Sequence, residues 1–168
     1  MIIPFNPDPA VSLQDLDYIS EQGITDVFTL MVPGELVKYR VPNLVQELEN
    51  RGIFVHLHPV EDGGLPPVDL LMQLLGRITG LLAEPGNRVL IHCYGGLGRT
   101  CLLAACLLLS LDPAMRPESA ISYLRALRGA RAVQTVRQWN FIQEFPRLEK
   151  EFREKEVLYE DRSRSVSR

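Results

Sequence analysis

The sequence has little of what would place it in several large classes of protein. Its three cysteines in 168 residues are too few, and odd in number, for a disulfide scaffold, which indicates a reducing compartment and an intracellular protein. The longest apolar run, residues 102–111, is too short to cross a bilayer, and the start of the chain lacks a signal-peptide pattern. A net charge of −3 gives no support to nucleic-acid binding by bulk charge. We therefore expect neither a membrane nor a nucleic acid as partner.

Length and composition predict one globular domain. With 46% hydrophobic and 23% charged residues, the chain can bury one substantial core but is too short for two ordinary domains. The charged, serine-rich end of the sequence predicts a disordered tail over 161–168. The domain is accordingly assigned to residues 1–160, and we expect it to be monomeric.

Strand-like and helix-like apolar segments alternate along the chain. Runs typical of strands occupy residues 24–31, 52–60 and 89–92, and Met1–Phe5 is a candidate for a short edge strand. Helical spacing follows an N-cap at Ser12, then recurs over 35–50 with a break at Pro42, over 68–83, 100–111 and 117–128, and from Thr135 onward. Helices between strands are the usual crossovers of parallel sheets. The order therefore predicts an α/β fold, with a central, mainly parallel sheet flanked by helices.

A glycine-rich loop joins the third strand to the helix that follows it. Five residues separate Cys93 from Arg99, and they are Tyr94, Gly95, Gly96, Leu97 and Gly98. Three glycines let the backbone curl with its N–H groups pointing inward. The helix directs its positive end at the same hollow, and the guanidinium of Arg99 supplies a planar fork for two phosphate oxygens. The loop is thus predicted to bind a phosphate dianion.

Cys93 lies at the floor of this hollow. The inward N–H groups, the helix terminus and Arg99 all favour its thiolate over its thiol. A thiolate beneath a bound phosphoryl group is a nucleophile, so Cys93 is the candidate catalytic residue. The alternative is that Cys93 is a buried small hydrophobe, as most free cysteines are. The loop around it makes this the weaker interpretation.

The Cys-x5-Arg-Thr pattern, preceded by His92, resembles the active-site signature of the protein tyrosine and dual-specificity phosphatases. A Walker-type phosphate loop is excluded because Gly-Lys-Ser/Thr is absent. Residues 34–44, 62–64 and 128–129 also resemble the cyclin-dependent kinase-associated phosphatase family, and this resemblance covers the chain from about Gly23 onward. It implies a single-domain dual-specificity-phosphatase-like fold with no metal and no organic cofactor. It also implies a phosphorylated cyclin-dependent kinase as partner and a cytoplasmic, perinuclear or nuclear location.

Four further residues have candidate roles at the same site. Asp62 lies on a glycine-rich loop at a distance before Cys93 that resembles the family's general acid; the alternative is a turn-forming aspartate. Thr100 can donate its hydroxyl to the sulfur, or is an ordinary first-turn residue. His92 is expected to order the loop through a hydrogen bond. Gln134 belongs to a stretch resembling the glutamine loop of tyrosine phosphatases, where it places the hydrolytic water or merely caps a helix.

Three classes of function fit this reading. The first is a protein phosphatase that hydrolyses phosphothreonine, phosphoserine or phosphotyrosine through a cysteinyl phosphate and so restrains the cell cycle by acting on the kinase activation segment. The second is a phosphoinositide or other non-protein phosphatase, which the absence of lysine from the loop disfavours. The third is a non-catalytic kinase-docking module, which the joint presence of Cys93, Arg99 and Asp62 disfavours. The resemblance further implies that the last helix docks on the kinase, with Trp139, Ile142 and Phe145 buried.

Overall fold

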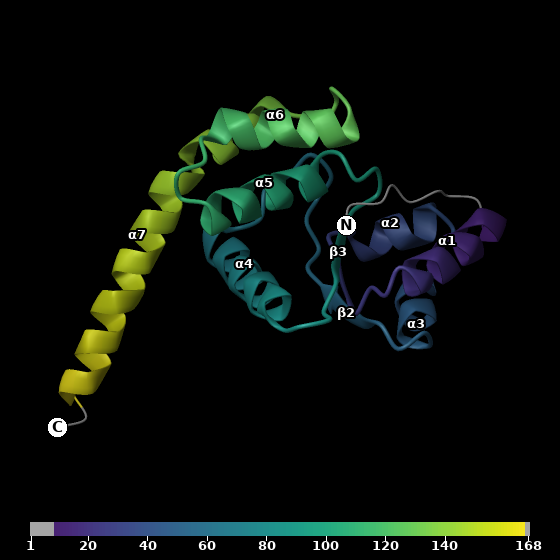
Figure 1. Ribbon diagram of the computed structural model, residues 1–168, viewed down its shortest axis with the longest axis horizontal. Helices are drawn as coiled ribbons and strands as arrows, with labels where there is room; N and C mark the ends of the chain where they lie inside the picture. Colours follow the sequence, from purple (N-terminus) through teal and green to yellow (C-terminus); the bar gives the residue numbers. More distant parts are fainter. Residues whose placement is uncertain (1–8, 167–168) are drawn as a thin grey trace.

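A computed structural model describes residues 9–166 and places a parallel three-stranded sheet among seven helices in that range (Figure 1). The elements follow in the order α1 (Pro9–Glu21), β1 (Asp26–Thr29), α2 (Pro33–Lys38), α3 (Leu44–Glu49), β2 (Phe54–Leu57), α4 (Val68–Ala83), β3 (Val89–His92), α5 (Arg99–Leu111), α6 (Pro117–Arg128) and α7 (Val136–Val166). This confirms the expected α/β fold. None of the helices in residues 9–166 combines the length and apolar character needed to cross a membrane.

The sheet has the strand order β2-β1-β3, with every pairing parallel. The central strand β1 ends at Thr29, which is in register with Leu57 of β2 and His92 of β3. Because parallel strands end at the same edge, the segments that follow the three strands leave the sheet side by side. That edge is where the glycine-rich loop begins.

Two apolar clusters cover the two faces of the sheet. Since successive side chains of a strand point to opposite faces, Phe28 and Ile91 join the cluster with α4, α5, α6 and α7, whereas Val27 and Leu90 join the cluster with α1 and α3. Figure 1 shows the first three helices on one side of the sheet and the last four on the other. The helix α5 is buried on nearly all sides, as its continuous apolar sequence predicts.

The helices α4 and α6 have the bounds predicted from their periodicity, but the first helix does not. It begins at Pro9, so Ser12 lies inside the helix rather than at its cap. Proline fits the first turn of a helix because its missing N–H is not needed there. The strand expected at Met1–Phe5 lies outside the described residues.

The helix α7 differs from its prediction in two respects. Trp139 is 40% exposed and not buried, whereas Ile142 and Phe145 are fully buried. Gln138, Ile142 and Phe145 lie three or four residues apart on the inward stripe, and Trp139 falls beside it. The helix also continues to Val166, well into the expected tail, while residues 167 and 168 lie outside the described range. The boundary of the domain at residue 160 stays a prediction.

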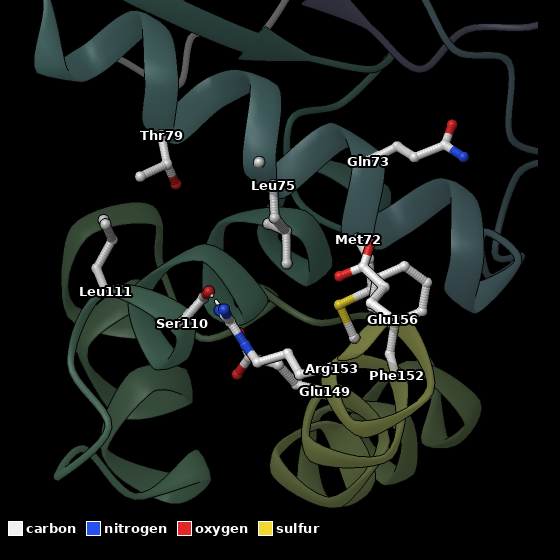
Figure 2. Close-up of a pocket in the computed structure, with 11 residues that line it drawn as sticks. Met72, Gln73, Leu75, Thr79, Ser110, Leu111, Glu149, Phe152, Arg153 and Glu156 are labelled. Carbon is white, nitrogen blue, oxygen red and sulfur yellow. Dashed lines mark hydrogen bonds and ion pairs between the residues drawn. The ribbon is translucent and has the colours of Figure 1, made fainter. Parts of the chain in front are cut away.

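A groove of about 440 Å³ lies between α4, α5 and α7. Figure 2 shows Ser110, Glu149 and Arg153 converging in it, and the hydroxyl of Ser110 and the guanidinium of Arg153 both donate to Oε1 of Glu149 at 2.7 Å. Met72 and Phe152 supply apolar walls. The groove lies at the carboxyl end of α5, so the whole length of that helix separates it from Arg99.

Candidate active site

The three glycines of the loop between β3 and α5 differ in how strongly their positions require glycine. Gly96 has a φ of +64°, in the left-handed region that side chains other than glycine rarely adopt. A Cβ on Gly98 would lie 2.6 Å from Oε1 of Gln134, so the flexible, exposed side chain of Gln134 would have to move to make room for it. Gly95 is under neither constraint, because a Cβ there would have no heavy atom within 4 Å. The loop therefore curls tightly enough to bring the start of α7 against it.

Arg99 is 1% exposed and its guanidinium is fixed from two sides. Nη1 donates to the carbonyls of Leu30 and Val60, which follow β1 and β2, at 3.3 and 2.8 Å. Nη1 and Nη2 also donate to the two carboxylate oxygens of Glu35 at 2.6 and 2.7 Å. Its Nε–H is buried without a partner among the described residues. A fixed cation with one unused donor is suited to receive an anionic oxygen.

Glu35 is a residue of the site that the sequence did not reveal. Burial alone would raise the pKa of its carboxyl, but the hydrogen bond from Arg99 and the N–H of Val32 outweigh that effect and lower the pKa below its usual value. Burial likewise opposes the charge of Arg99, but the hydrogen bond to Glu35 and the nearby Cys93, Glu35 and Asp62 together outweigh it and raise the guanidinium pKa. Glu35 stands in the first turn of α2, where an acidic residue ordinarily serves as a cap. This position gives no sign of the contact with Arg99.

Asp62, the predicted general acid, lies beside Arg99. Its Oδ1 is 3.2 Å from Nη2 of Arg99, and its side chain is 79% exposed. The turn that carries it is closed by a 2.8 Å hydrogen bond from the N–H of Gly64 to the carbonyl of Glu61. A Cβ on Gly64 would lie 2.8 Å from that same oxygen, so the turn needs glycine there. The carboxyl group thus reaches both the guanidinium and the solvent.

His92 and Thr100 flank the loop at its two ends, and both are buried. Nδ1 of His92 lies 3.4 Å from the carbonyl oxygen of Cys93 and can donate to it, which is the loop-ordering contact expected of it. Burial lowers the pKa of His92 to about 4, so the ring is neutral at physiological pH. The hydroxyl of Thr100 is buried without a partner among the described residues, which leaves it free to donate to an atom bound in the loop.

The start of α7 packs against the loop through two glutamines. The N–H of Val133 donates to the carbonyl of Leu97 at 2.9 Å, and Gln134 covers Gly98. Gln138 is fully buried, and its Oε1 accepts from the N–H of Gln134 at 3.0 Å. Gln138 was not predicted, because a glutamine one turn into a helix usually marks a surface position. The predicted Gln134 is therefore beside the loop, and Gln138 holds it there.

Two aromatic rings meet on the opposite side of the loop. Tyr94, which directly follows Cys93, stacks on Tyr39 with ring centroids 3.7 Å apart and an interplanar angle of 12°. Nζ of Lys38 lies 5.2 Å from the centroid of the Tyr39 ring. The loop is thus contacted by α2, by the turn after β2 and by the start of α7.

The other two cysteines differ from Cys93 in their surroundings. Burial raises the pKa of the Cys101 thiol to about 11, and it raises that of Cys106 further. Both lie in α5 among apolar side chains, and Sγ of Cys101 donates to the carbonyl of Gly96 at 3.4 Å. Both thiols are protonated at neutral pH and are therefore poor nucleophiles. Cys93 differs in its position, because it directly precedes the glycine-rich loop.

The described part of the chain holds no group of three or more His, Cys, Asp and Glu side chains that could bind a metal ion. His56, which lies on an edge strand, is taken up by a different contact: its Nε2 is 2.7 Å from Oδ1 of the buried Asp26. Its ring also stacks on Phe28 at a centroid distance of 4.3 Å. This pair lies within the sheet and not at its carboxyl edge.

Comparisons with known proteins give consistent findings. Residues 10–121 match the family described as cyclin-dependent kinase inhibitor 3 (CDKN3). The chain is 44% identical to human cyclin-dependent kinase inhibitor 3 over 159 residues, which cover 92% of this chain and 71% of that one. It is 28% identical to mouse protein tyrosine phosphatase type IVA 2, over 86% and 90% of the two chains. A solved structure of kinase associated phosphatase, with its catalytic-site cysteine replaced by serine, superimposes with a TM-score of 0.78 at 42% identity, covering 85% and 82%.

Proposed function

We propose a substrate for this chain from its family, since the chain belongs to the cyclin-dependent kinase inhibitor 3 family. The proposed reaction removes the phosphate from the activation-segment phosphothreonine of a cyclin-dependent kinase. The chain is a cysteine-based dual-specificity protein phosphatase. The observation that carries the proposal is the buried Cys93 at the start of a glycine loop whose far end holds the fixed cation of Arg99. Removal of the activating phosphate restrains the kinase and, through it, the cell cycle.

In the first step, the thiolate of Cys93 attacks the phosphorus of the bound monoester. The sulfur–phosphorus bond forms as the bond to the substrate oxygen breaks, and Asp62 gives its proton to that departing oxygen. The N–H groups of residues 94–98 and the guanidinium of Arg99 hold the remaining phosphate oxygens. The unpaired Nε–H of Arg99 supports this assignment, because a bound oxygen would complete its hydrogen bonding.

In the second step, water attacks the phosphorus of the cysteinyl phosphate. Asp62, now a carboxylate, takes a proton from the water, the sulfur–phosphorus bond breaks, and its electron pair returns to the sulfur. The free hydroxyl of Thr100 donates to the leaving thiolate, and Gln134 places the water over the loop. His92 stays neutral and holds the carbonyl of Cys93 in place.

The partner is selected by contacts outside the pocket, because a phosphothreonine offers few atoms beyond its phosphate. We assign these contacts to α7, whose outer face presents Arg147 and Lys150 to solvent. Figure 1 shows the last turns of α7, in yellow, projecting beyond the other helices, and Arg147 and Lys150 lie on the part of α7 that precedes these turns. We place the enzyme, as a monomer, in the cytoplasm, around the nucleus or within it.

The proposal is tested by phosphate release from an activated, phosphorylated cyclin-dependent kinase, compared with release from a panel of phosphoinositides. We expect release from the kinase by the native chain and none by Cys93→Ser, because a serine hydroxyl stays protonated in the same surroundings. The variant should still bind tungstate, since the N–H ring and Arg99 remain. Faster release from a phosphoinositide than from the kinase would contradict the proposed substrate, and turnover by Cys93→Ser would contradict the mechanism.

Docking by α7 is tested with the double variant Arg147→Glu and Lys150→Glu. We expect kcat/KM to fall on the intact phosphorylated kinase and to stay unchanged on a small aryl phosphate, because only the kinase is large enough to touch α7. Both side chains pair with acidic neighbours on the same exposed helix, so little stability depends on them. Unchanged kinetics on the kinase, or an equal fall on both substrates, would remove α7 as the docking element.

A further inference from the structure

We infer that α2 is a positioning element that holds both ends of the phosphate loop, with Glu35 and Tyr39 as the residues through which it acts. The inference rests on the proposed function of that loop. Glu35 and Tyr39 are four residues apart, so they project from the same face of one helix and its carboxyl cap. Glu35 contacts Arg99, where the loop ends, and Tyr39 contacts Tyr94, where it begins.

The contact at the end of the loop orients the guanidinium of Arg99 as well as balancing its charge. Glu35 holds Nη1 and Nη2 of Arg99 at 2.6 and 2.7 Å in a bidentate geometry, which defines the plane of the guanidinium. Glu35 itself accepts the N–H of Val32 at 3.0 Å and cannot turn away freely. The plane of Arg99, and with it the direction of its unused Nε–H, is therefore set by α2 together with the carbonyls of Leu30 and Val60.

The contact at the start of the loop constrains the backbone beside the nucleophile. The rings of Tyr39 and Tyr94 are nearly parallel at 3.7 Å, so neither can tilt or slide without losing contact with the other. Both side chains are partly exposed, and the ring plane is not fixed by enclosure on all sides. Since Tyr94 follows Cys93 directly, the stack holds the side chain of the residue that shares a peptide group with the nucleophile.

The helix α2 has few other means of holding its place. It contains no buried residue, and Val37 on its outer face is 68% exposed. A helix of six residues is not stable by itself in water. Its anchors away from the loop are Leu36 and Tyr39, which pack on the cluster with α1 and α3, and the buried Val41, whose N–H donates to the Leu36 carbonyl at 2.9 Å. The helix thus connects that cluster to the phosphate loop.

The stacking contact is tested by oxyanion binding, which does not require turnover. In the Cys93→Ser background, we expect Tyr39→Leu to weaken tungstate binding about tenfold, because an aromatic pair contributes roughly the corresponding free energy. Tyr39→Phe should restore binding, since the stack uses the ring and not the hydroxyl. Val37→Ala, on the outer face of the same helix, is the matched control and should bind tungstate as the parent does. Isothermal calorimetry gives the affinities, and thermal unfolding shows which variants are folded.

The two contacts are tested together by a double-mutant cycle with Glu35→Gln. If both contacts act on one loop, the two substitutions will not have independent effects on tungstate affinity. The fold-loss of affinity in the double variant Tyr39→Leu and Glu35→Gln will then be smaller than the product of the two single fold-losses. Unchanged tungstate affinity in Tyr39→Leu, with only its melting temperature lowered, would overturn the inference and leave a merely structural stack. Should that variant fail to fold, Tyr94→Leu removes the same stack from the loop side and decides by the same criterion. Absence of tungstate binding by the parent would instead refute the proposed function.

Discussion

The two halves of the candidate site differ in their access to solvent. His92, Cys93, Arg99 and Thr100 are all buried, whereas Asp62 and Gln134 are exposed. The buried residues would bind phosphate and carry the nucleophile, and the exposed ones would move protons and water. Charge stabilisation is strongest where water is excluded, while proton and water exchange need contact with solvent. The difference therefore follows from what each half has to do.

The two halves also rest on different kinds of structure. The buried half stands on β3 and α5, which are packed from both sides. The exposed half stands on the turn at residues 61–64 and on the segment before α7, and each is held by a few hydrogen bonds. Substitutions in the exposed half should change rates with little effect on folding, and changes in the buried half should affect stability.

The largest effect is expected from Asp62→Asn in the exposed half. Loss of the proton donor should lower kcat/KM for an alkyl phosphate by about 10²- to 10⁴-fold and for an activated aryl phosphate far less, since only the alkoxide needs a proton to leave. Glu61→Gln is the matched control, because it removes a neighbouring exposed carboxyl from the same turn. Equal losses on the two substrates, or an equal loss in the control, would mean that Asp62 is not the acid.

An effect of intermediate size is expected from pH in the buried half. His92 titrates near 4 in the folded chain and near 6.5 when unfolded, so the unfolded chain takes up the proton first as the pH falls. The free energy of unfolding should drop by about 3 kcal/mol between pH 7 and pH 4 through this residue. Urea titrations of the native chain and of His92→Gln at several pH values measure the difference. A pH dependence that is the same in both would show that His92 is not the cause.

The smallest effect is expected from Gly34→Ala in α2, which borders the buried half through the contact of Glu35 with Arg99. A Cβ there would have no heavy atom within 4 Å, and alanine favours the helix, so stability should rise by up to about 1 kcal/mol. Gly52→Ala is the control, because it has equal space but a φ of +75° and should destabilise the fold. Thermal unfolding compares the two. A lower melting temperature for Gly34→Ala would show that α2 requires glycine there.

The sequence predicted best the elements whose signals are local. The run from β3 through the loop to α5 could be predicted because β-branched residues, glycines and an apolar helix follow one another directly. Glu35, Tyr39 and Gln138 could not be predicted, since each contacts a loop residue far away in the chain, and a short amphipathic helix such as α2 gives no sign of its partner. The predicted burial of Trp139 is wrong because the prediction relied on the hydrophobicity of the side chain. In the structure Trp139 lies beside the buried stripe of α7 and not within it.

The contact between Val133 and Leu97 has a consequence for the order in which the enzyme matures during synthesis. The ribosome releases residues 93–99 well before residues 133–138, and parallel sheets form slowly because their contacts are distant in sequence. A nascent chain can therefore possess the cysteine loop while the glutamines that cover it are still untranslated. On the role proposed for Gln134, the chain would complete the second hydrolytic step only after the start of α7 has docked on the loop.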